Sequence, residues 1–425
     1  MRRAAARLRP WFCGLPCGEM RLPAARGGAG RAEGGCPVCR EEVGSFREEE
    51  AGPRRGGAPA SLEEAIAAAA RILLTARAPF VYGLARSATE TARRAAALAA
   101  ALGGGIDVEA PPGARADRIA LQTFGLPGAT FGEIRNRADL VLLWRCDPRA
   151  THPHLLAGAP RTPLQPPGTR RVILLPPAAE PPSRARADLL LAAIPGSDLE
   201  VALALRAMAA GRRPAGETIG GVPAAAVRQA ADLLRAARYA AILWDTAATG
   251  GPDGPAVASA LTLLARDLNA AGRCAARPLG GGGNVAGAAT AILGATGSPG
   301  AVGFGSGRPR FAPGEYDAGR ILGEALCDAL LLVGARGPLP ATLSRRPGGA
   351  PRIVALGPRL PAGAAEPDVF IPTGLPGLSE EGEAMRADGV PVRLRATLLT
   401  RRPAEREVLA ALEQAVAAGR GSAVA

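Results

Sequence analysis

The sequence of 425 residues contains no lysine, two histidines and few aromatic residues. All 51 basic side chains are therefore arginines, and against 38 acidic residues they give a net charge of +13. This charge is typical of nucleic-acid-binding proteins, but those also use aromatic side chains to stack on bases, and aromatics make up only 3% of this chain. The arginines are spread along the chain, as expected from a GC-rich genome that favours Arg, Ala, Gly and Pro codons. Nucleic-acid binding is therefore kept only as an alternative hypothesis.

Long apolar runs are also missing. No stretch reaches the ~18–20 consecutive apolar residues of a transmembrane helix. The basic start, MRRAAARLRPWF, is not followed by the apolar segment and small-residue cleavage site of a signal peptide. Seven cysteines in a chain of this length do not make a disulfide framework. We therefore expect a cytoplasmic protein without a membrane partner, whose cysteines are reduced.

Helical and strand-like segments alternate from Ser61 onward. Ser61 and Glu64 form a capping-box pattern at the start of a predicted helix. Short apolar runs at 80–82, 139–144, 171–175, 240–244, 330–333 and 352–356 predict buried strands. This alternation favours an α/β protein with two Rossmann-like parallel-sheet domains. We predict an irregular cysteine-containing lobe at 1–60, the two domains at 61–221 and 222–375, and β segments with a helix at 376–425.

The two predicted domains contain a sequence repeat. GEIRNRADLVLLWRCDP from Gly132 is similar to LGEALCDALLLVGA from Leu322, and RRVILLPP from Arg170 is similar to PRIVALGP from Pro351. A third pair of segments, ADLLLAAIPGSDLE and PDVFIPTGLPGLSEE, follows in the same order. The repeat indicates an old duplication.

Four of the seven cysteines lie near the N-terminus, in two close pairs. The segment FCGLPC contains Cys13 and Cys17, and CPVC contains Cys36 and Cys39. Four thiolates from two short turns can bind zinc tetrahedrally or hold an iron–sulfur cluster. The first pair has three intervening residues, whereas zinc sites usually have two. Small buried residues without a metal remain the third possibility.

Two further segments are candidates for binding. The glycine-rich loop from Gly280 to Asn284 precedes a predicted helix and can offer N–H groups to an anion, or it is a flexible turn with Asn284 as helix cap. Both histidines, His152 and His154, follow the predicted strand 139–144, at the strand end where ligands bind in parallel sheets. They are candidate general bases or ligands, or they are structural.

Long segments resemble a known family. The opening FCGLPCGEM, the stretch from Gln122 to His154, the stretch from Asn284 to Asp317 and the stretch from Val369 to Arg395 resemble the B subunit of formylmethanofuran dehydrogenase, a molybdopterin oxidoreductase-like protein. The similarity is greater to the B subunit of the bacterial formyltransferase/hydrolase complex. The resemblance implies a molybdopterin oxidoreductase-like fold and, in the redox members, a pterin cofactor with molybdenum or tungsten and a four-iron–four-sulfur cluster.

This sequence departs from the redox members at two ligand positions. Their cluster motif, Cys-x-x-Cys-x-x-x-Cys with a distant fourth cysteine, places Cys13 and Cys17 second and third and Cys36 fourth, but its first position falls on Pro10. The Cys or selenocysteine that binds molybdenum or tungsten is replaced by Gly113. Asp117 and Asp107 are the short-armed alternatives nearby, and neither is at the aligned position. The resemblance therefore implies no catalytic centre and no bound cofactor in this chain.

The resemblance to the bacterial complex implies a non-redox structural subunit. In that complex the formyl group passes from formyl-tetrahydromethanopterin to a methanofuran-type carrier and is then hydrolysed to formate. The implied partners are a formyltransferase subunit and an amidohydrolase-type subunit that performs the hydrolysis. An active molybdenum or tungsten formylmethanofuran dehydrogenase catalytic subunit is the alternative from the same family.

Overall fold

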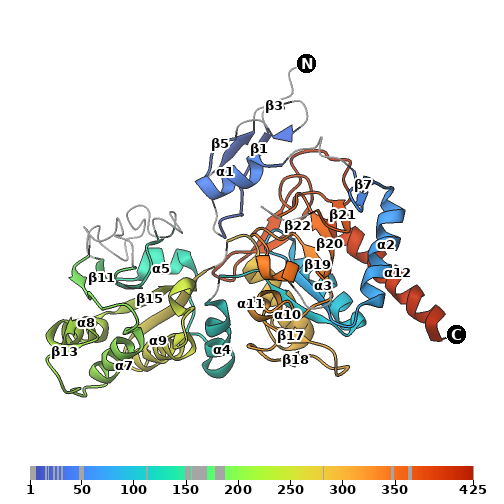
Figure 1. Cartoon of the computed structure of the whole chain (residues 1–425). Coiled ribbons are helices and arrows are strands. Elements are labelled where there is room, and N and C mark those ends of the chain that lie inside the picture. The colour runs from blue at the N-terminus through green and yellow to red at the C-terminus, as the bar shows by residue number, and fades with distance from the viewer. Residues whose placement is uncertain are drawn as a thin grey trace. The chain divides into compact units, whose positions relative to one another are not determined.

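A computed structural model describes residues 6–14, 17, 19–22, 24–25, 28–29, 32–46, 52–111, 113–148, 155, 170–177, 187–280, 282–345, 349–361 and 366–424. The chain divides into two compact units. One, here called the discontinuous unit, comprises 1–110 and 281–425, and the other, the inserted unit, comprises 111–280. Each unit is built on its own sheet, as Figure 1 shows.

The sheet of the discontinuous unit has nine strands, of which the central five are parallel. In spatial order they are β18 (Arg310–Phe311), β17 (Val302–Gly303), β9 (Gly105–Val108), β8 (Pro79–Gly83), β19 (Ala329–Val333), β20 (Arg352–Gly357), β21 (Val369–Pro372), β6 (Arg54–Arg55) and β7 (Ala58–Pro59). The short outer strands at both sides pair antiparallel. Burial on both faces explains why the central strands are continuous apolar runs rather than alternating ones.

Helices cover both faces of this sheet. One face packs against α2 (Leu62–Thr75), α3 (Thr89–Leu102), α10 (Val285–Thr296) and α12 (Glu405–Val424), and the other against α11 (Ala318–Gly323) and η3 (Ala341–Arg345). Figure 1 shows α2 and α12 side by side. The predicted capping box is present, because Ser61 accepts from the Glu64 N–H and the Glu64 carboxylate accepts from the Ser61 N–H. Side chains of successive strand residues, such as Leu331 and Leu332, enter opposite cores.

The inserted unit contains a five-stranded sheet in which every pair is parallel. Its strands, in spatial order, are β12 (Leu189–Leu190), β11 (Arg171–Leu175), β10 (Leu140–Trp144), β15 (Tyr239–Asp245) and β16 (Arg273–Leu279). The helices within its described residues are α4 (Ala114–Phe124), α5 (Phe131–Arg137), α7 (Asp198–Ala209), α8 (Ala224–Ala236), η2 (Thr246–Thr249) and α9 (Gly254–Leu268), and a hairpin joins β13 (Thr218–Ile219) to β14 (Val222–Pro223). The core includes Trp144 and Trp244, which are fully buried.

The strand pairing corrects the predicted domain boundaries. The repeated segments form β10–β12 and β19–β21, and both trios are followed in their sheets by two more strands in equivalent order, β15–β16 and β8–β9. However, β8–β9 pair with the trio of the second half, and β15–β16 pair with the trio of the first. Each unit therefore combines parts of both halves, 61–221 and 222–375. Crossovers between parallel strands are long enough to reach either sheet, so sequence order does not decide the partner.

The two terminal segments belong to the discontinuous unit. The N-terminal lobe is more regular than predicted: β1 (Ala6–Leu8), β2 (Met20–Leu22) and β5 (Glu33–Gly34) form a small antiparallel sheet, followed by α1 (Pro37–Gly44). A separate short hairpin joins β3 (Ala24–Ala25) to β4 (Gly28–Ala29). At the other end, β22 (Gly382–Met385) and β23 (Pro391–Leu394) form a hairpin before α12. Among the described helices, none has the length and apolar character to cross a membrane.

Candidate functional site

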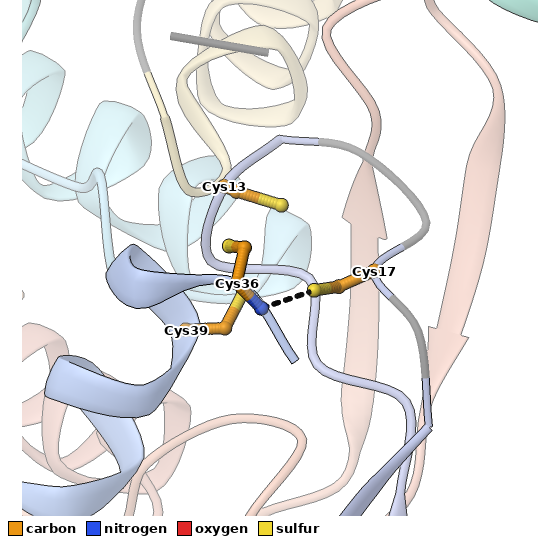
Figure 2. A group of neighbouring side chains, drawn as sticks. All are labelled: Cys13, Cys17, Cys36 and Cys39. Carbon is orange, nitrogen blue, oxygen red and sulfur yellow. Dashed lines mark hydrogen bonds between the residues drawn. The ribbon is translucent and has the colours of Figure 1, made fainter. Parts of the chain in front are cut away.

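Four buried cysteines of the N-terminal lobe converge on one point. The Sγ atoms of Cys13, Cys17, Cys36 and Cys39, here called the four-cysteine cluster, all lie within 4.8 Å of one another. Figure 2 shows the four side chains together and the hydrogen bond that the Cys36 N–H donates to Cys17 Sγ over 3.0 Å. The structure thus brings together all four cysteines that the sequence analysis offered as candidate metal ligands.

Two local features of the chain produce this convergence. Gly35, in the left-handed region at φ +64°, leads directly into α1, and a Cβ there would lie 2.5 Å from the Met20 side chain. Pro37 then occupies the first turn of α1, where its missing N–H is not needed. Cys36 caps this helix and Cys39 lies three residues later, so both thiols are at its N-terminal end. The positive end of the helix dipole favours thiolates there.

The four thiols cannot all ionise independently. Hydrogen bonds within the cluster, followed by burial, raise the pKa of Cys13 and Cys39. Hydrogen bonding with the neighbouring thiols, first with Cys13, lowers the pKa of Cys17 and brings the pKa of Cys36 to about 6. These opposite shifts follow from the close approach of the four sulfurs.

Gly113, which the sequence analysis aligned with the family's metal ligand, has no room for a side chain. Gly113 precedes α4, and a Cβ built on it would lie 1.6 Å from the carbonyl oxygen of Thr246 and 2.4 Å from Thr249 Oγ1. Both threonines belong to η2 in the same unit. Since real Cβ contacts are never that short, the backbone around Gly113 is closed against any larger residue.

The neighbouring carboxylates are occupied with structural contacts. Asp117 Oδ1 accepts from Trp244 Nε1 over 2.8 Å and from Thr249 Oγ1 over 3.3 Å, and burial raises its pKa to about 6. Asp107 accepts from three backbone N–H groups, those of Val108, Ala301 and Ala318, at 2.9–3.0 Å. These contacts use both oxygens of Asp107 but only Oδ1 of Asp117, whose Oδ2 is buried without a hydrogen-bond partner among the described residues.

The sequence analysis missed a cluster of arginines at the carboxyl ends of three parallel strands. Arg86, Arg336 and Arg359 follow β8, β19 and β20, and all three pair with Glu42 of α1. The Nε atoms of Arg86 and Arg336 lie 2.8 and 3.0 Å from the Glu42 carboxylate, and Arg359 Nη2 lies 3.7 Å away. The side chains of Glu42 and Arg86 are each only 4% exposed. The pattern Gly-x-Arg or Gly-x-x-Arg after each strand was a usable signal.

This arginine cluster lies where such sheets normally bind ligands. Crossovers from β8 and β19 lead to opposite sides of the sheet, which makes their carboxyl ends a topological switch point. In this chain the carboxylate of Glu42 lies among the three arginines and neutralises part of their charge. An anionic ligand would have to displace it.

Comparison with known proteins identifies the family. The chain is 32% identical over 335 residues to the B subunit of the formyltransferase/hydrolase complex Fhc of Methylorubrum extorquens, and the match covers 77% of this chain and 86% of the relative. The chain belongs to this B-subunit family. It is also 28% identical over 344 residues, 78% of both chains, to the B subunit of a tungsten-containing formylmethanofuran dehydrogenase 2 of Methanococcus maripaludis. No family model matches.

Solved structures agree with this assignment to the B-subunit family. The crystal structure of the Methylorubrum extorquens formyltransferase/hydrolase complex with methylofuran contains a chain that matches with TM-score 0.72 and 26% identity, over 87% of this chain and 99% of that one. Acetylene hydratase from Pelobacter acetylenicus matches with TM-score 0.63 at 12% identity over 97% of this chain and 69% of that one, which shows the fold alone. The predicted molybdopterin oxidoreductase-like α/β fold is confirmed.

In this member of the B-subunit family, two N–H groups of the loop before α10 are already hydrogen-bonded to the protein. The N–H groups of Gly283 and Asn284 donate to the carbonyls of Phe12 and Ala85 over 2.7 and 2.9 Å, so these two are not free for an anion. One alternative predicted that the Asn284 side chain caps α10, but it makes no capping hydrogen bond to this helix. Instead it donates to the Ser87 carbonyl and accepts from the Met385 N–H. His152 and His154 lie outside the described residues.

Proposed function

We propose that this chain is a non-redox structural B subunit of a formyltransferase/hydrolase complex. The observation that carries the proposal is the packing of Gly113 against Thr246, which leaves no space for the molybdenum or tungsten ligand of the redox members. The residues present therefore do not fit that metal. The resemblance supplies the reaction of the complex: transfer of a formyl group to a methanofuran-type carrier and its hydrolysis to formate.

In this proposal the chain supplies no reacting group. Its inserted unit is closed at Gly113, and in its discontinuous unit Glu42 neutralises the arginines at the switch point. The chain contributes a folded surface to the assembly, and the hydrolytic chemistry belongs to an amidohydrolase-type partner. A formyltransferase subunit is the second proposed partner. None of the seven cysteines forms a disulfide in the structure, and we propose a cytoplasmic location.

The decisive experiment is coexpression of this chain with its candidate partners, followed by purification through a tag on this chain alone. We expect both partners to copurify, and the complex to hydrolyse formyl-tetrahydromethanopterin to formate when the carrier is present. Molybdenum, tungsten and pterin should all be below stoichiometric amounts. Stoichiometric metal and pterin with viologen-linked oxidation of formylmethanofuran would instead establish the dehydrogenase alternative, and a monomer that captures neither partner would refute the structural role.

A further inference from the structure

We propose that the four-cysteine cluster binds a single zinc ion in a closed tetrahedral site, with Cys39 as the ligand that completes it. The site is independent of the proposed function, because it lies in the N-terminal lobe and takes no part in formyl transfer. It also differs from the four-iron–four-sulfur cluster that the redox members of the family hold. Geometry, ligand supply and burial support the proposal separately.

The spacing of the sulfurs fits one ion. Zinc–sulfur bonds of about 2.3 Å place the thiolates of a tetrahedral site roughly 3.8 Å apart. The four Sγ atoms lie within 4.8 Å of one another, so a small inward movement brings them to bonding distance from a common centre. In a four-iron cluster each cysteine binds a different iron. The cysteine sulfurs therefore lie farther apart than in a site with a single zinc ion. The arrangement of this chain does not fit such a cluster.

The set of cysteines near the site also favours zinc over the family's iron–sulfur cluster. Pro10 stands where the cluster motif has its first cysteine, and it is buried beside the site: its Cγ and Cys17 Sγ are both 3.8 Å from the point where a Cβ on Gly35 would lie. Proline has no donor atom. Cys39 provides the fourth thiol from the first turn of α1, next to Cys36. The number of thiolates is restored to four from a new place in the chain.

The surroundings suit a structural rather than a catalytic metal. All four cysteines are buried, with exposed fractions of 0–5%. A catalytic zinc site keeps a coordination position for water, whereas a Cys₄ set fills all four positions with protein ligands. The N–H···S bond from Cys36 to Cys17 also stabilises a thiolate on Cys17. Since tetrahedral sulfur sites select zinc or iron–sulfur centres, zinc is the metal that this donor set and spacing favour.

The ion would act on the fold through α1. Cys36 is the N-cap residue of this helix, Cys39 lies in its first turn, and Glu42 follows one turn later and pairs with Arg86 and Arg336 beyond the carboxyl ends of β8 and β19. Zinc bound at the first turn would hold the helix in the position that keeps Glu42 between the arginines. Loss of zinc should therefore release the lobe while leaving the sheet itself folded.

The test uses the full chain, purified without oxygen, with zinc and iron measured by mass spectrometry and acid-labile sulfide measured chemically. We expect about one zinc per chain and neither iron nor sulfide in proportion. In Cys39→Ser we expect zinc to fall below about a tenth of the wild-type content, because a three-thiolate site is incomplete. The matched control is Cys274→Ala, which removes a buried cysteine from the core of the inserted unit and should keep the zinc.

A second measurement does not depend on the folding of a variant. Replacing zinc by Co²⁺ in the wild-type chain should give the intense visible bands of cobalt bound tetrahedrally by thiolates. Iron with sulfide in the purified chain, iron alone, or no metal at all would each overturn the proposal. So would full zinc content in Cys39→Ser, or cobalt spectra without thiolate bands.

Discussion

The substitution Gly113→Ala tests whether the backbone around Gly113, the proposed counterpart of the family's metal ligand, has room for a side chain. The added methyl group would lie 1.6 Å from the Thr246 carbonyl oxygen. Gly113 precedes α4 and Thr246 belongs to η2, so relieving this contact requires a movement of the backbone. Overpacking of this kind costs typically about 1–3 kcal/mol, and this contact is at the severe end. The backbone angle of Gly113, φ −77°, suits alanine, so the restricted unfolded chain returns about 0.4–1 kcal/mol.

The net destabilisation expected for Gly113→Ala is therefore about 2 kcal/mol. In a unit of this size that lowers the melting temperature by roughly 4–8 °C. Differential scanning calorimetry of the full chain should show the effect in the transition of the inserted unit. Gly251→Ala is the matched control, since it lies in the same unit with nothing within 4 Å of the added Cβ. Equal melting temperatures for Gly113→Ala and Gly251→Ala would show that the position has room for a side chain and would refute the argument for a closed metal site.

Three further changes test the contacts around the site. Asp117→Asn should remove a pH dependence of the free energy of unfolding. The pKa of Asp117 is about 6 in the folded chain and about 3.9 in the unfolded chain, so the folded chain binds the proton more tightly. The wild type should therefore lose up to about 3 kcal/mol of stability as the pH rises from about 4 to about 6. Urea unfolding at several pH values measures this, and an unchanged slope in Asp117→Asn would contradict it. Glu42→Gln leaves the buried Arg86 without its anion and should cost about 3 kcal/mol, seen as faster proteolytic release of the N-terminal lobe, whereas exposed Glu41→Gln should have no effect. Asn284→Ala removes three buried hydrogen bonds and should cost about 2–4 kcal/mol by chemical denaturation, and a free energy of unfolding equal to that of the wild type would contradict this.

Local sequence signals predicted the secondary structure well. The capping box at Ser61 and Glu64 starts α2, and the run DLVLLW forms β10, because caps and buried apolar runs depend on nearby residues. The same local signals could not predict which strands pair with each other. The repeat showed that β10–β12 and β19–β21 are equivalent, but either trio could have paired with β8 and β9.

The candidate site was predicted unequally for a similar reason. The two close cysteine pairs could be named from spacing, because two short turns suffice to bring them together. The contact of Gly113 with Thr246 joins residues far apart in sequence, and the resemblance showed only that a ligand was missing, not that its space was filled. The three arginines around Glu42 required knowledge of which strands are neighbours.

The exchange of strand pairs between the two halves has a consequence for biosynthesis. Strand β8 emerges early from the ribosome but pairs with β19, where Pro79 lies opposite Ala329. All the strands of the inserted unit are synthesised in the interval. The inserted unit can therefore complete its sheet first, while α2, β8 and α3 wait with their apolar faces uncovered. During this interval the nascent chain presents the exposed hydrophobic surface that chaperones bind, and a ribosome stalled before β19 would leave it in that state.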